Sequence, residues 1–527
     1  MSCMHKLGRI LSRCSVGVTA IVLLVNGCAM VGPDYKQPEV EEPKEWIEKE
    51  EPRIKSEPED FGKWWTALND PVLDRLIEIA YEQNLPLRIA GIRILEARAR
   101  LGIAKGTLYP QTQQAVGSYA RVGASENTAN IPPPGFFDSS YSDYQVSFDA
   151  AWELDFWGRF RRAVQSGIGN FEVSIADYDN TLVTLTAEVA RTYVVIRTLE
   201  ERLAIARENV KIQERSQRIA QVRFKGGDVS ELDVSQATAL LKDTEALIPR
   251  LKSDLRQAYN GLSILLGILP GESGGLLVGT KGIPIVPAEV AVGIPAELLR
   301  RRPDIRGAER SMAAQSARIG FAKADLYPHF ALFGSIGFAA ASSSDLFDSN
   351  SLQAVGGPAV TWDIFNYGRI KNRVRVQDAV FQGLVVNYQN TVLKAAQEVE
   401  DAMVAFLRTQ EEAGLLAESV KAYKRSVDLS MLQYREGLTD YQRVLDTQRF
   451  LTLAQEGQIS TQGSVVINLI AMYKALGGGW EIRMGKDFVP EDIIKQMEER
   501  TDWGNLLTPE ELKEPPEDPK LWQSPDW

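Results

Sequence analysis

Two long stretches of the chain place mostly apolar residues at the spacing of a coiled coil. No proline interrupts 158–248 or 359–489, although the chain contains 25 prolines. Steps of four and three residues connect matching positions of the two stretches: Leu182, Thr186, Val189, Tyr193 and Ile196 in the first, and Val392, Ala396, Val399, Met403 and Phe406 in the second. This spacing predicts long, packed helices. A continuous helix from Gly158 to Phe224 would be about 100 Å long, at about 1.5 Å per residue.

Each long stretch contains a turn signal, FKGGDVSEL in the first and YREGLTDYQ in the second. Gly227 and Gly437 have the position of glycines that end a helix. Capping boxes after them predict the start of an antiparallel helix; their residues are Asp228 with Glu231 and Thr439 with Gln442. Each half of the chain therefore contains a helical hairpin whose tip lies near Gly227 or Gly437.

Four shorter segments alternate apolar and polar residues, which predicts β-strands. The clearest reads YQVSFDAAWELD, with one apolar face and one polar, acidic face. The four segments are 144–155, 330–338, 360–364 and, more weakly, 112–122. Strands of about ten residues suit a tilted crossing of a bilayer, although a soluble sandwich shows the same alternation. Because about eight strands are the observed minimum for a membrane barrel, these four either pair with strands of other subunits or do not cross.

The two stretches belong to a tandem repeat. WELDFWGR at 152–159 returns as WDIFNYGR at 362–369, an offset of 210 residues. LYP at 108–110 returns at 326–328, an offset of 218, so the first copy carries a longer loop. The chain is therefore two copies of one helix, strand hairpin and helical hairpin unit. We assign 86–275 and 303–479 to the copies and 276–302 to an equatorial connection.

Aromatic residues gather near the predicted strand ends. They are Tyr109, Trp157, Tyr327 and Tyr367. Such residues form a girdle at a membrane interface or pack in a core, and the sequence leaves both interpretations open.

The N-terminus has the pattern of an export signal. Lys6, Arg9 and Arg13 precede a short apolar run that ends in LVNGC, so residues 1–27 are predicted to be a signal peptide. The last residues resemble a bacterial lipobox, which predicts an N-acyl and S-diacylglycerol lipid on Cys28. The alternative is an ordinary secretory signal with Cys28 as a spare thiol. With a lipid on Cys28, residues 28–85 would contain the lipid anchor, an extended strap and a first short helix.

The composition restricts the chemistry of the mature chain. Removing the three basic charges of the signal peptide takes the formal net charge from −11 to −14 and leaves one cysteine and one histidine, His329. These residues cannot form a disulfide scaffold, a Cys/His zinc site or a nucleophile–base pair. We therefore expect no enzyme, no cofactor beyond the lipid, no metal site and no nucleic-acid partner. The acidic tail, 480–527, has no assigned role.

Several motifs together resemble the TolC-like outer-membrane factors, specifically the lipoprotein branch of RND-type efflux systems. They are VGPDY after the lipobox, the two LYP junctions, ELDFWGR, WDIFNYGR, RRPDIRGAER from Arg301 and LDTQR from Leu445, and the resemblance covers about 28–479. It implies a mostly α fold with a membrane β part. Three subunits would form a homotrimer in which an α-barrel of coiled-coil helices continues into a 12-stranded β-barrel, four strands coming from each subunit.

The resemblance also implies a function. The trimer would be a passive exit duct in the outer membrane of a Gram-negative bacterium, lipid-anchored and extending into the periplasm. A periplasmic adaptor and an inner-membrane RND-type transporter would dock near Gly227 and Gly437, and small amphiphilic compounds or drugs would leave through the duct. Protein or peptide secretion and metal-ion efflux are the alternatives. A lipid-anchored periplasmic enzyme is a more distant one.

The same resemblance implies a gate at the periplasmic end. Asp446 and Arg449 match the constriction and its nearby basic residue, while Tyr434 and Asp233 match a pair that links neighbouring hairpins. Thr439 and Arg443 stand where TolC itself carries an arginine and a second aspartate. The alternative for Asp446 and Arg449 is a solvated ion pair on a helix face. RRPDIRGAER is predicted to be structural, with Pro303 at a helix start and its charged residues interlinked.

Overall fold

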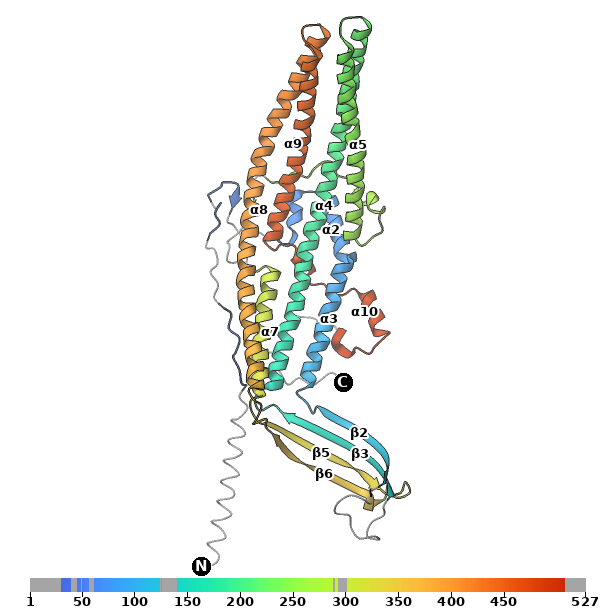
Figure 1. Cartoon of the computed structure of the whole chain (residues 1–527), viewed down its shortest axis with the longest axis vertical. Helices are drawn as coiled ribbons and strands as arrows, with labels where there is room; N and C mark the ends of the chain where they lie inside the picture. Colours follow the sequence, from blue (N-terminus) through green and yellow to red (C-terminus); the bar gives the residue numbers. More distant parts are fainter. Residues whose placement is uncertain are drawn as a thin grey trace, which may run out of the picture.

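The computed structural model of the chain describes residues 30–38, 45–48, 50–55, 61–123, 125, 140–287, 290–291 and 301–507. The predicted signal peptide, 1–27, and Cys28 lie outside these ranges, as does 508–527 of the acidic tail. The described part is an elongated shaft of helices with a sheet at one end (Figure 1). None of the described helices combines the length and apolar character that a membrane crossing needs.

The helices of the two copies match in length. The first copy contains α3 (Leu85–Gly106), α4 (Arg159–Lys225) and α5 (Glu231–Leu265), and the second contains α7 (Pro303–Ala324), α8 (Arg369–Arg435) and α9 (Tyr441–Ala475). The lengths are 22, 67 and 35 residues in both copies. α4 and α8 are each about 100 Å long, as the uninterrupted apolar spacing predicted.

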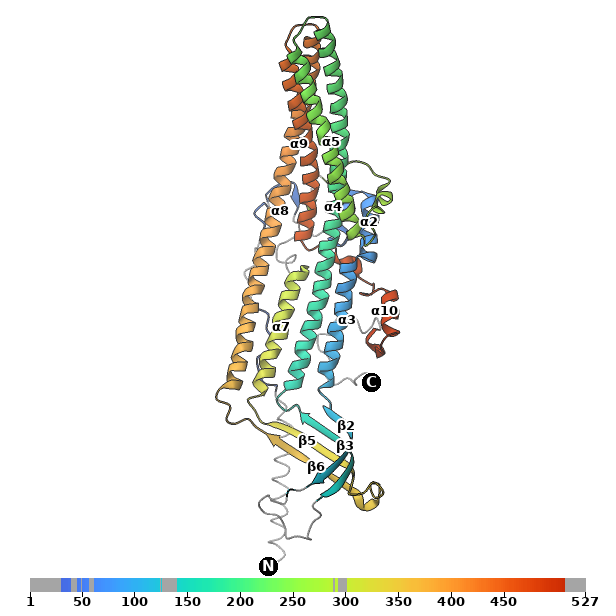
Figure 2. The same cartoon turned by 45° about the vertical axis from the view of Figure 1, so that its right-hand side comes forward.

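The helices lie side by side along the shaft. Next to the sheet the order is α3, α4, α7, α8, and in the far half α5 and α9 take the places of α3 and α7 (Figures 1 and 2). Among the shorter helices, η1 (Phe61–Leu68), α2 (Pro71–Gln83) and α10 (Glu491–Glu498) lie against the shaft away from its tips. One edge of the molecule is therefore formed by α3 and α5 and the other by α8.

The predicted apolar seam forms the core of the shaft. Nine of its ten side chains are buried, and Ala396 is partly buried. Tyr193 and Phe406 have no exposed surface. Burying an aliphatic or aromatic side chain contributes about 1.5–3 kcal/mol, so this seam is a main source of packing energy.

Both hairpin tips are built by the same backbone motif. Gly227 and Gly437 adopt left-handed φ angles of +80° and +76°. The residue after each glycine donates its backbone N–H to the carbonyl five residues earlier, Asp228 to Arg223 at 3.0 Å and Leu438 to Gln433 at 2.8 Å. These bonds satisfy carbonyls that the helix end leaves free, and the prediction of helix-ending glycines is confirmed.

The predicted capping boxes are wrong by one or two residues. The residue that precedes α5 is Ser230 and the one that precedes α9 is Asp440, instead of Asp228 and Thr439. The reason is that the backbone N–H after each glycine is used to close the preceding helix, so the chain needs further extended residues before the next helix can begin. Asp440 does cap α9, because its Oδ1 accepts the backbone N–H of Arg443 at 3.3 Å.

Four antiparallel strands form the sheet, in the order β2, β3, β5, β6. Their bounds are Thr112–Gly123, Ser140–Leu154, His329–Ala340 and Leu352–Thr361. The prediction of four strands is confirmed, but the last one ends before Trp362 and Ile364. The reason is the register: Thr361 pairs with His329, the first residue of β5, so β5 offers no partner to Trp362.

The register places apolar side chains on one face of the sheet. Phe148 lies opposite Ala115 and Ile336, and Val146 lies opposite Phe338. Because directly opposed residues share a face, these rows join into one apolar face across the strands. The other face carries the acidic Asp149 and Glu153. Phe148 and Ile336 remain 50% and 54% exposed, so the described residues leave the apolar face uncovered.

The N-terminal strap begins where the sheet meets the shaft and runs along α8. The Val31 N–H donates to the Trp157 carbonyl at 3.0 Å, and the Ile47 N–H donates to Glu400 at 3.0 Å. Farther on, Arg53 forms an ion pair with Glu411 at 3.0 Å. A two-residue parallel ladder follows, between β1 (Ile54–Lys55) and β4 (Val290–Ala291). Residues 30–38 are extended, while turns occur at 47–48 and 52–53, and the assignment of a strap to 28–85 stays a prediction.

The described part of the C-terminal tail packs against the first copy. Its short helices are η4 (Trp480–Arg483), α10 and η5 (Gly504–Leu507). Val489, Met497 and Leu507 cluster on Leu95 of α3. A Cβ atom at Gly91 would lie 2.3 Å from the Phe488 carbonyl oxygen, so only glycine permits this approach. The tail up to residue 507 thus packs against the α3 side of the shaft.

Candidate functional site at the helical tips

The two hairpins of the chain are joined near their tips by a buried tyrosine pair. Tyr434 of α8 and Tyr441 of α9 are 0% and 1% exposed, and their rings meet edge to face with centroids 5.2 Å apart. The Tyr434 hydroxyl donates to Asp233 Oδ2 of α5 at 2.9 Å. Burial, and secondly this bond to a carboxylate, raise the pKa of Tyr434. The structure therefore brings together two of the four predicted gate residues, one from each hairpin.

Arg223 completes this contact from the last turn of α4. Its guanidinium Nη1 donates to the Tyr434 backbone carbonyl, and its Cζ lies 4.8 Å from the centre of the Tyr434 ring. The Tyr434 ring makes a cation–π contact with Arg223, and its hydroxyl donates to the Asp233 carboxylate. Tyr434 therefore connects the second hairpin to both helices of the first. We use the name tip clasp for Arg223, Asp233, Tyr434 and Tyr441. Sequence analysis missed Arg223, because nothing local marks a partner more than 200 residues away.

Neutral side chains extend the tip clasp toward the middle of the shaft. The hydroxyls of Ser216 in α4 and Tyr441 in α9 are 2.9 Å apart and buried. Gln236 of α5 donates to Gln442 of α9 at 3.1 Å in a more exposed position. The only sequence signal for Tyr441 was an aromatic residue where the first copy has the charged Glu231.

The other two predicted gate residues are not joined to the tip clasp. Asp446 is half-buried and accepts a hydrogen bond from Gln442 Nε2 at 3.0 Å. Arg449 is exposed, and the described residues record no ion pair between it and Asp446. The alternative of a solvated Asp446–Arg449 ion pair is therefore wrong for the single chain. Whether Asp446 constricts a lumen stays a prediction.

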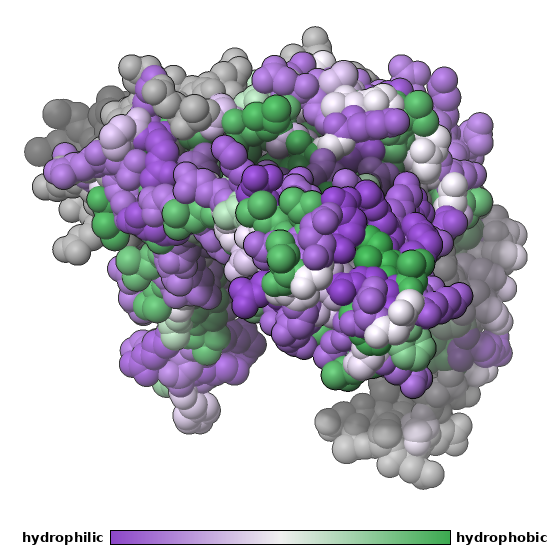
Figure 3. All heavy atoms as spheres, turned by 90° about the horizontal axis from the view of Figure 1, so that it is seen from above, coloured by the Kyte–Doolittle hydropathy of each residue, from purple (hydrophilic) through white to green (hydrophobic). Residues whose placement is uncertain are grey.

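The tips themselves present a mixed surface. Seen end-on, hydrophobic residues are scattered among hydrophilic ones (Figure 3). Leu438, beside Gly437, is 77% exposed, and Leu232 and Val222 near Gly227 are 62% and 69% exposed. Single exposed aliphatic side chains such as these are normal on a protein surface and do not by themselves mark a contact.

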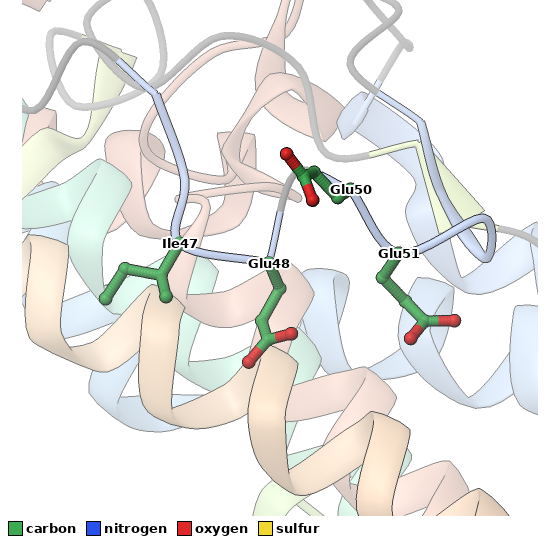
Figure 4. Close-up of a pocket in the computed structure, with 4 residues that line it drawn as sticks. All are labelled: Ile47, Glu48, Glu50 and Glu51. Carbon is green, nitrogen blue, oxygen red and sulfur yellow. The ribbon is translucent and has the colours of Figure 1, made fainter.

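The described surface has more than one hollow. One lies on the strap and is lined by Ile47, Glu48, Glu50 and Glu51, with Glu50 pointing away from Glu48 (Figure 4). Among the described residues, no three His, Cys, Asp or Glu side chains are placed to hold a metal ion. The strap hollow is thus a feature of the outer surface and is separate from the tip clasp.

RRPDIRGAER joins the copies near the middle of the shaft. Pro303 begins α7, and Arg302 before it pairs with Asp304 and with Glu398 of α8, each at 2.8 Å. Arg306 and Arg483 both bind Asp179 of α4, which is fully buried. The segment is structural, as predicted, but its arginines reach α4, α8 and the tail as well as their own helix.

Comparison with known proteins agrees with this architecture. The family model described as outer membrane efflux protein matches residues 76–268 and 294–478, one segment for each copy. The pyoverdine export outer membrane protein OpmQ of Pseudomonas putida is 31% identical over 421 residues, covering 80% of this chain and 88% of the relative. The probable outer membrane lipoprotein SilC of Salmonella typhimurium is 28% identical, with coverage of 87% and 97%.

Among solved structures, the outer-membrane channel OprN is similar with a TM-score of 0.79 and 31% identity, over 86% of this chain and 99% of that one. The same two-copy shaft and sheet is thus found across nearly the whole length of a known channel. Since both the family model and a relative above 30% identity span most of the repeats, this chain belongs to the outer membrane efflux protein family.

Proposed function

We propose that the chain is the outer-membrane exit duct of a tripartite efflux pump and that three copies form the duct. One observation carries this proposal: this member of the family combines a shaft about 100 Å long with a sheet whose apolar face is uncovered among the described residues. The shaft is long enough to reach far into the periplasm, and the apolar face suits lipid.

The strand count supports assembly from several copies. In the part of the chain that the structure describes, β2 and β6 lie at the two edges of the sheet and have one neighbour each. Exposed edges favour pairing with another strand, and four strands are too few to close a membrane barrel. Three copies would bring twelve strands and remove every edge.

The start of the strap supports the lipid anchor on Cys28. A Cβ atom at Gly158, where the sheet meets the shaft, would lie 2.4 Å from Met30 Cγ, so residue 30 is held close to this junction. A lipid two residues earlier would therefore start close to the level at which the apolar sheet face begins. Each buried acyl methylene contributes about 0.8 kcal/mol, so two or three chains would anchor the protein firmly.

The tips are the proposed docking end for a periplasmic adaptor and, through it, an inner-membrane RND-type transporter. They lie at the far end of the shaft from the sheet, and they carry exposed Leu232 and Leu438 around Gly227 and Gly437. The tip clasp would hold the hairpins closed until a partner changes their contacts. Symmetry-related copies of Asp446 near the axis would repel one another, which adds a charge-dependent element to such a gate.

Transport in cells tests the proposal. A Gram-negative strain without its own exit duct, supplied with this chain and a matching adaptor and pump, is expected to retain less of a fluorescent amphiphilic dye. A pump variant that cannot use the proton gradient is the control. Unchanged dye retention, with export of a peptide or a metal ion restored instead, would assign one of the alternatives.

A further inference from the structure

The two copies meet within the chain at the base of the shaft through a specific aromatic contact. The Trp157 ring of the first copy stacks on the Tyr327 ring of the second, with centroids 4.6 Å apart and planes 26° apart. The Trp157 indole Nε1 donates to the Pro328 carbonyl at 2.8 Å. Beside this stack, Glu153 pairs with His329 at 2.7 Å. Trp157, just before α4 of the first repeat, thus packs on the Tyr327-Pro328 step of the second repeat in the same chain.

Each copy also keeps the same internal geometry at this level. Trp152 donates to the Leu108 carbonyl at 3.2 Å, and its counterpart Trp362 donates to the Leu326 carbonyl at 3.1 Å. The glycine before each long helix is left-handed in both, Gly158 at φ +73° and Gly368 at +80°. Counterparts at the sequence offsets of 210 and 218 are therefore counterparts in space.

The counterpart of Trp157 has no such contact in its own chain. Tyr367 is 102% exposed, and its φ of +50° lies in the left-handed region, which non-glycine residues rarely adopt. The matching Tyr-Pro step is Tyr109-Pro110, which leads into β2 at the opposite edge of the sheet (Figures 1 and 2). Two strands lie between β2 and β6, a separation of about 14 Å, so Tyr367 cannot reach this step within one chain.

The long helices show the same difference higher in the shaft. Val183 and Val194 of α4 are 4% and 0% exposed. Their counterparts in α8, Leu393 and Val404, are 65% and 39% exposed. α4 has neighbours on both sides, whereas α8 ends the row. Equivalent apolar positions are covered in the first copy and uncovered in the second.

We propose that a second copy of this chain seats its Tyr109-Pro110 step on Tyr367 and its α3 and α5 edge on the free edge of α8, repeating the contact of Trp157 with Tyr327 and Pro328. This inference rests on the proposed assembly of three subunits into a closed duct, and it names a contact between neighbouring subunits. The interface is head-to-tail: each subunit contacts one neighbour through its α8 edge and the other neighbour through its α3 and α5 edge. The left-handed Tyr367 backbone is held in the conformation that presents its ring to the partner.

Cross-linking tests the contact, because the mature chain has no cysteine other than Cys28. Tyr109→Cys and Tyr367→Cys in one chain, treated with a short bifunctional thiol reagent in membranes, are expected to give covalent dimers and trimers. Trp157→Cys with Tyr327→Cys is the matched control for reach and is expected to cross-link within one chain. Tyr327→Cys with Tyr367→Cys, which lie at unmatched junctions, is expected to give no covalent oligomer.

Two negative results have different meanings. An oligomer by native mass measurement, with the Trp157/Tyr327 control cross-linked and the Tyr109/Tyr367 pair not, would overturn this contact and leave the exit duct standing. A protein that stays a monomer in detergent and in membranes would overturn both. As an independent measure, Tyr109→Ala and Tyr367→Ala are each expected to lower the temperature at which the oligomer dissociates, and the double variant little further. Fully additive losses would contradict a direct pair.

Discussion

α4 and α8 are the same element placed in different surroundings. Both have 67 residues, follow a left-handed glycine and end in the same glycine turn. Yet α4 lies inside the row, with α3 and α5 on one side and α7 and α9 on the other, whereas α8 lies at its end. Val194 is therefore buried while its counterpart Val404 is 39% exposed. A repeated sequence reproduces a helix, but its position in the chain decides which of its faces is covered.

The beginnings of the two helices differ in the same sense. Asp155 accepts the backbone N–H groups of Phe160 and Arg161 at 3.0 Å each, and so satisfies the free donors at the start of α4. The counterpart of Asp155 is Phe365, which is 90% exposed. The copies diverge where one junction lies inside the chain and the other at its edge.

The largest expected effect is a loss of stability from a substitution in α4 whose counterpart in α8 is expected to be nearly neutral. Asp179→Ala leaves Arg306 and Arg483 without their buried partner, and removing one member of a buried ion pair typically costs about 3–5 kcal/mol. Chemical unfolding in detergent measures this loss. Gln389, the exposed counterpart in α8, is the matched control, and Gln389→Ala is expected to change the unfolding free energy by less than about 0.5 kcal/mol.

The next prediction sharpens the comparison of covered and uncovered faces. Val194→Ala removes two buried carbon groups and is expected to cost about 2 kcal/mol in the unfolding of the chain itself. Val404→Ala is expected to leave unfolding of the monomer nearly unchanged and to weaken the oligomer instead. Unfolding and oligomer dissociation are measured on the same two variants. Equal effects of both substitutions on the monomer would show that α8 is covered within the chain.

The tip clasp carries the third prediction. Tyr434→Phe removes the hydrogen bond to the Asp233 carboxylate, worth about 1.5 kcal/mol, and is expected to raise single-channel conductance in planar bilayers. The folded chain raises the pKa of Tyr434 above its ordinary value of about 10. The stabilising contribution is therefore complete below pH of about 10 and is lost as the pH rises further. Conductance is expected to stay constant from about pH 6 to 9 and to rise above about pH 10.

A matched variant isolates this alkaline step. Tyr434→Phe has no phenolic proton at this position, so its conductance is expected to lack the step, while Tyr423→Phe, which leaves the tip clasp intact, keeps it. An alkaline step of equal size in Tyr434→Phe would assign the effect to other groups.

The smallest expected effect concerns Asp446 and Arg449. Asp446 and Arg449 form no ion pair in the chain, so Asp446→Ala and Arg449→Ala are expected to change conductance independently. The two changes in the free energy of channel opening, obtained from conductance, are expected to add within about 0.5 kcal/mol in the double variant. Asp446→Ala is also expected to reduce the preference for cations, because it removes a negative charge from the proposed constriction. A strongly non-additive double variant would indicate a pair formed only in the assembled duct.

Much of the fold could be predicted because its signals are local. The seam around Val189 and Val399, the tip glycines Gly227 and Gly437, and the alternation around Phe148 each depend on residues a few positions apart. The errors arose where a backbone group serves a neighbouring element, as the Asp228 N–H does in closing α4, or where the partner strand sets the end of a strand, as His329 of β5 does for β6. Family membership agrees with the expectation of a transport protein instead of an enzyme.

The amino-acid sequence by itself determined the two-copy plan, the long helices, the four strands and the family, because period and motif spacing are properties of neighbouring residues. Only the tertiary structure decided that Arg223 holds Tyr434, that Asp179 binds two arginines, and that Asp446 and Arg449 stay apart. Those contacts join residues more than a hundred positions apart or depend on side-chain direction. Their geometry follows from packing of whole helices, which no local pattern records.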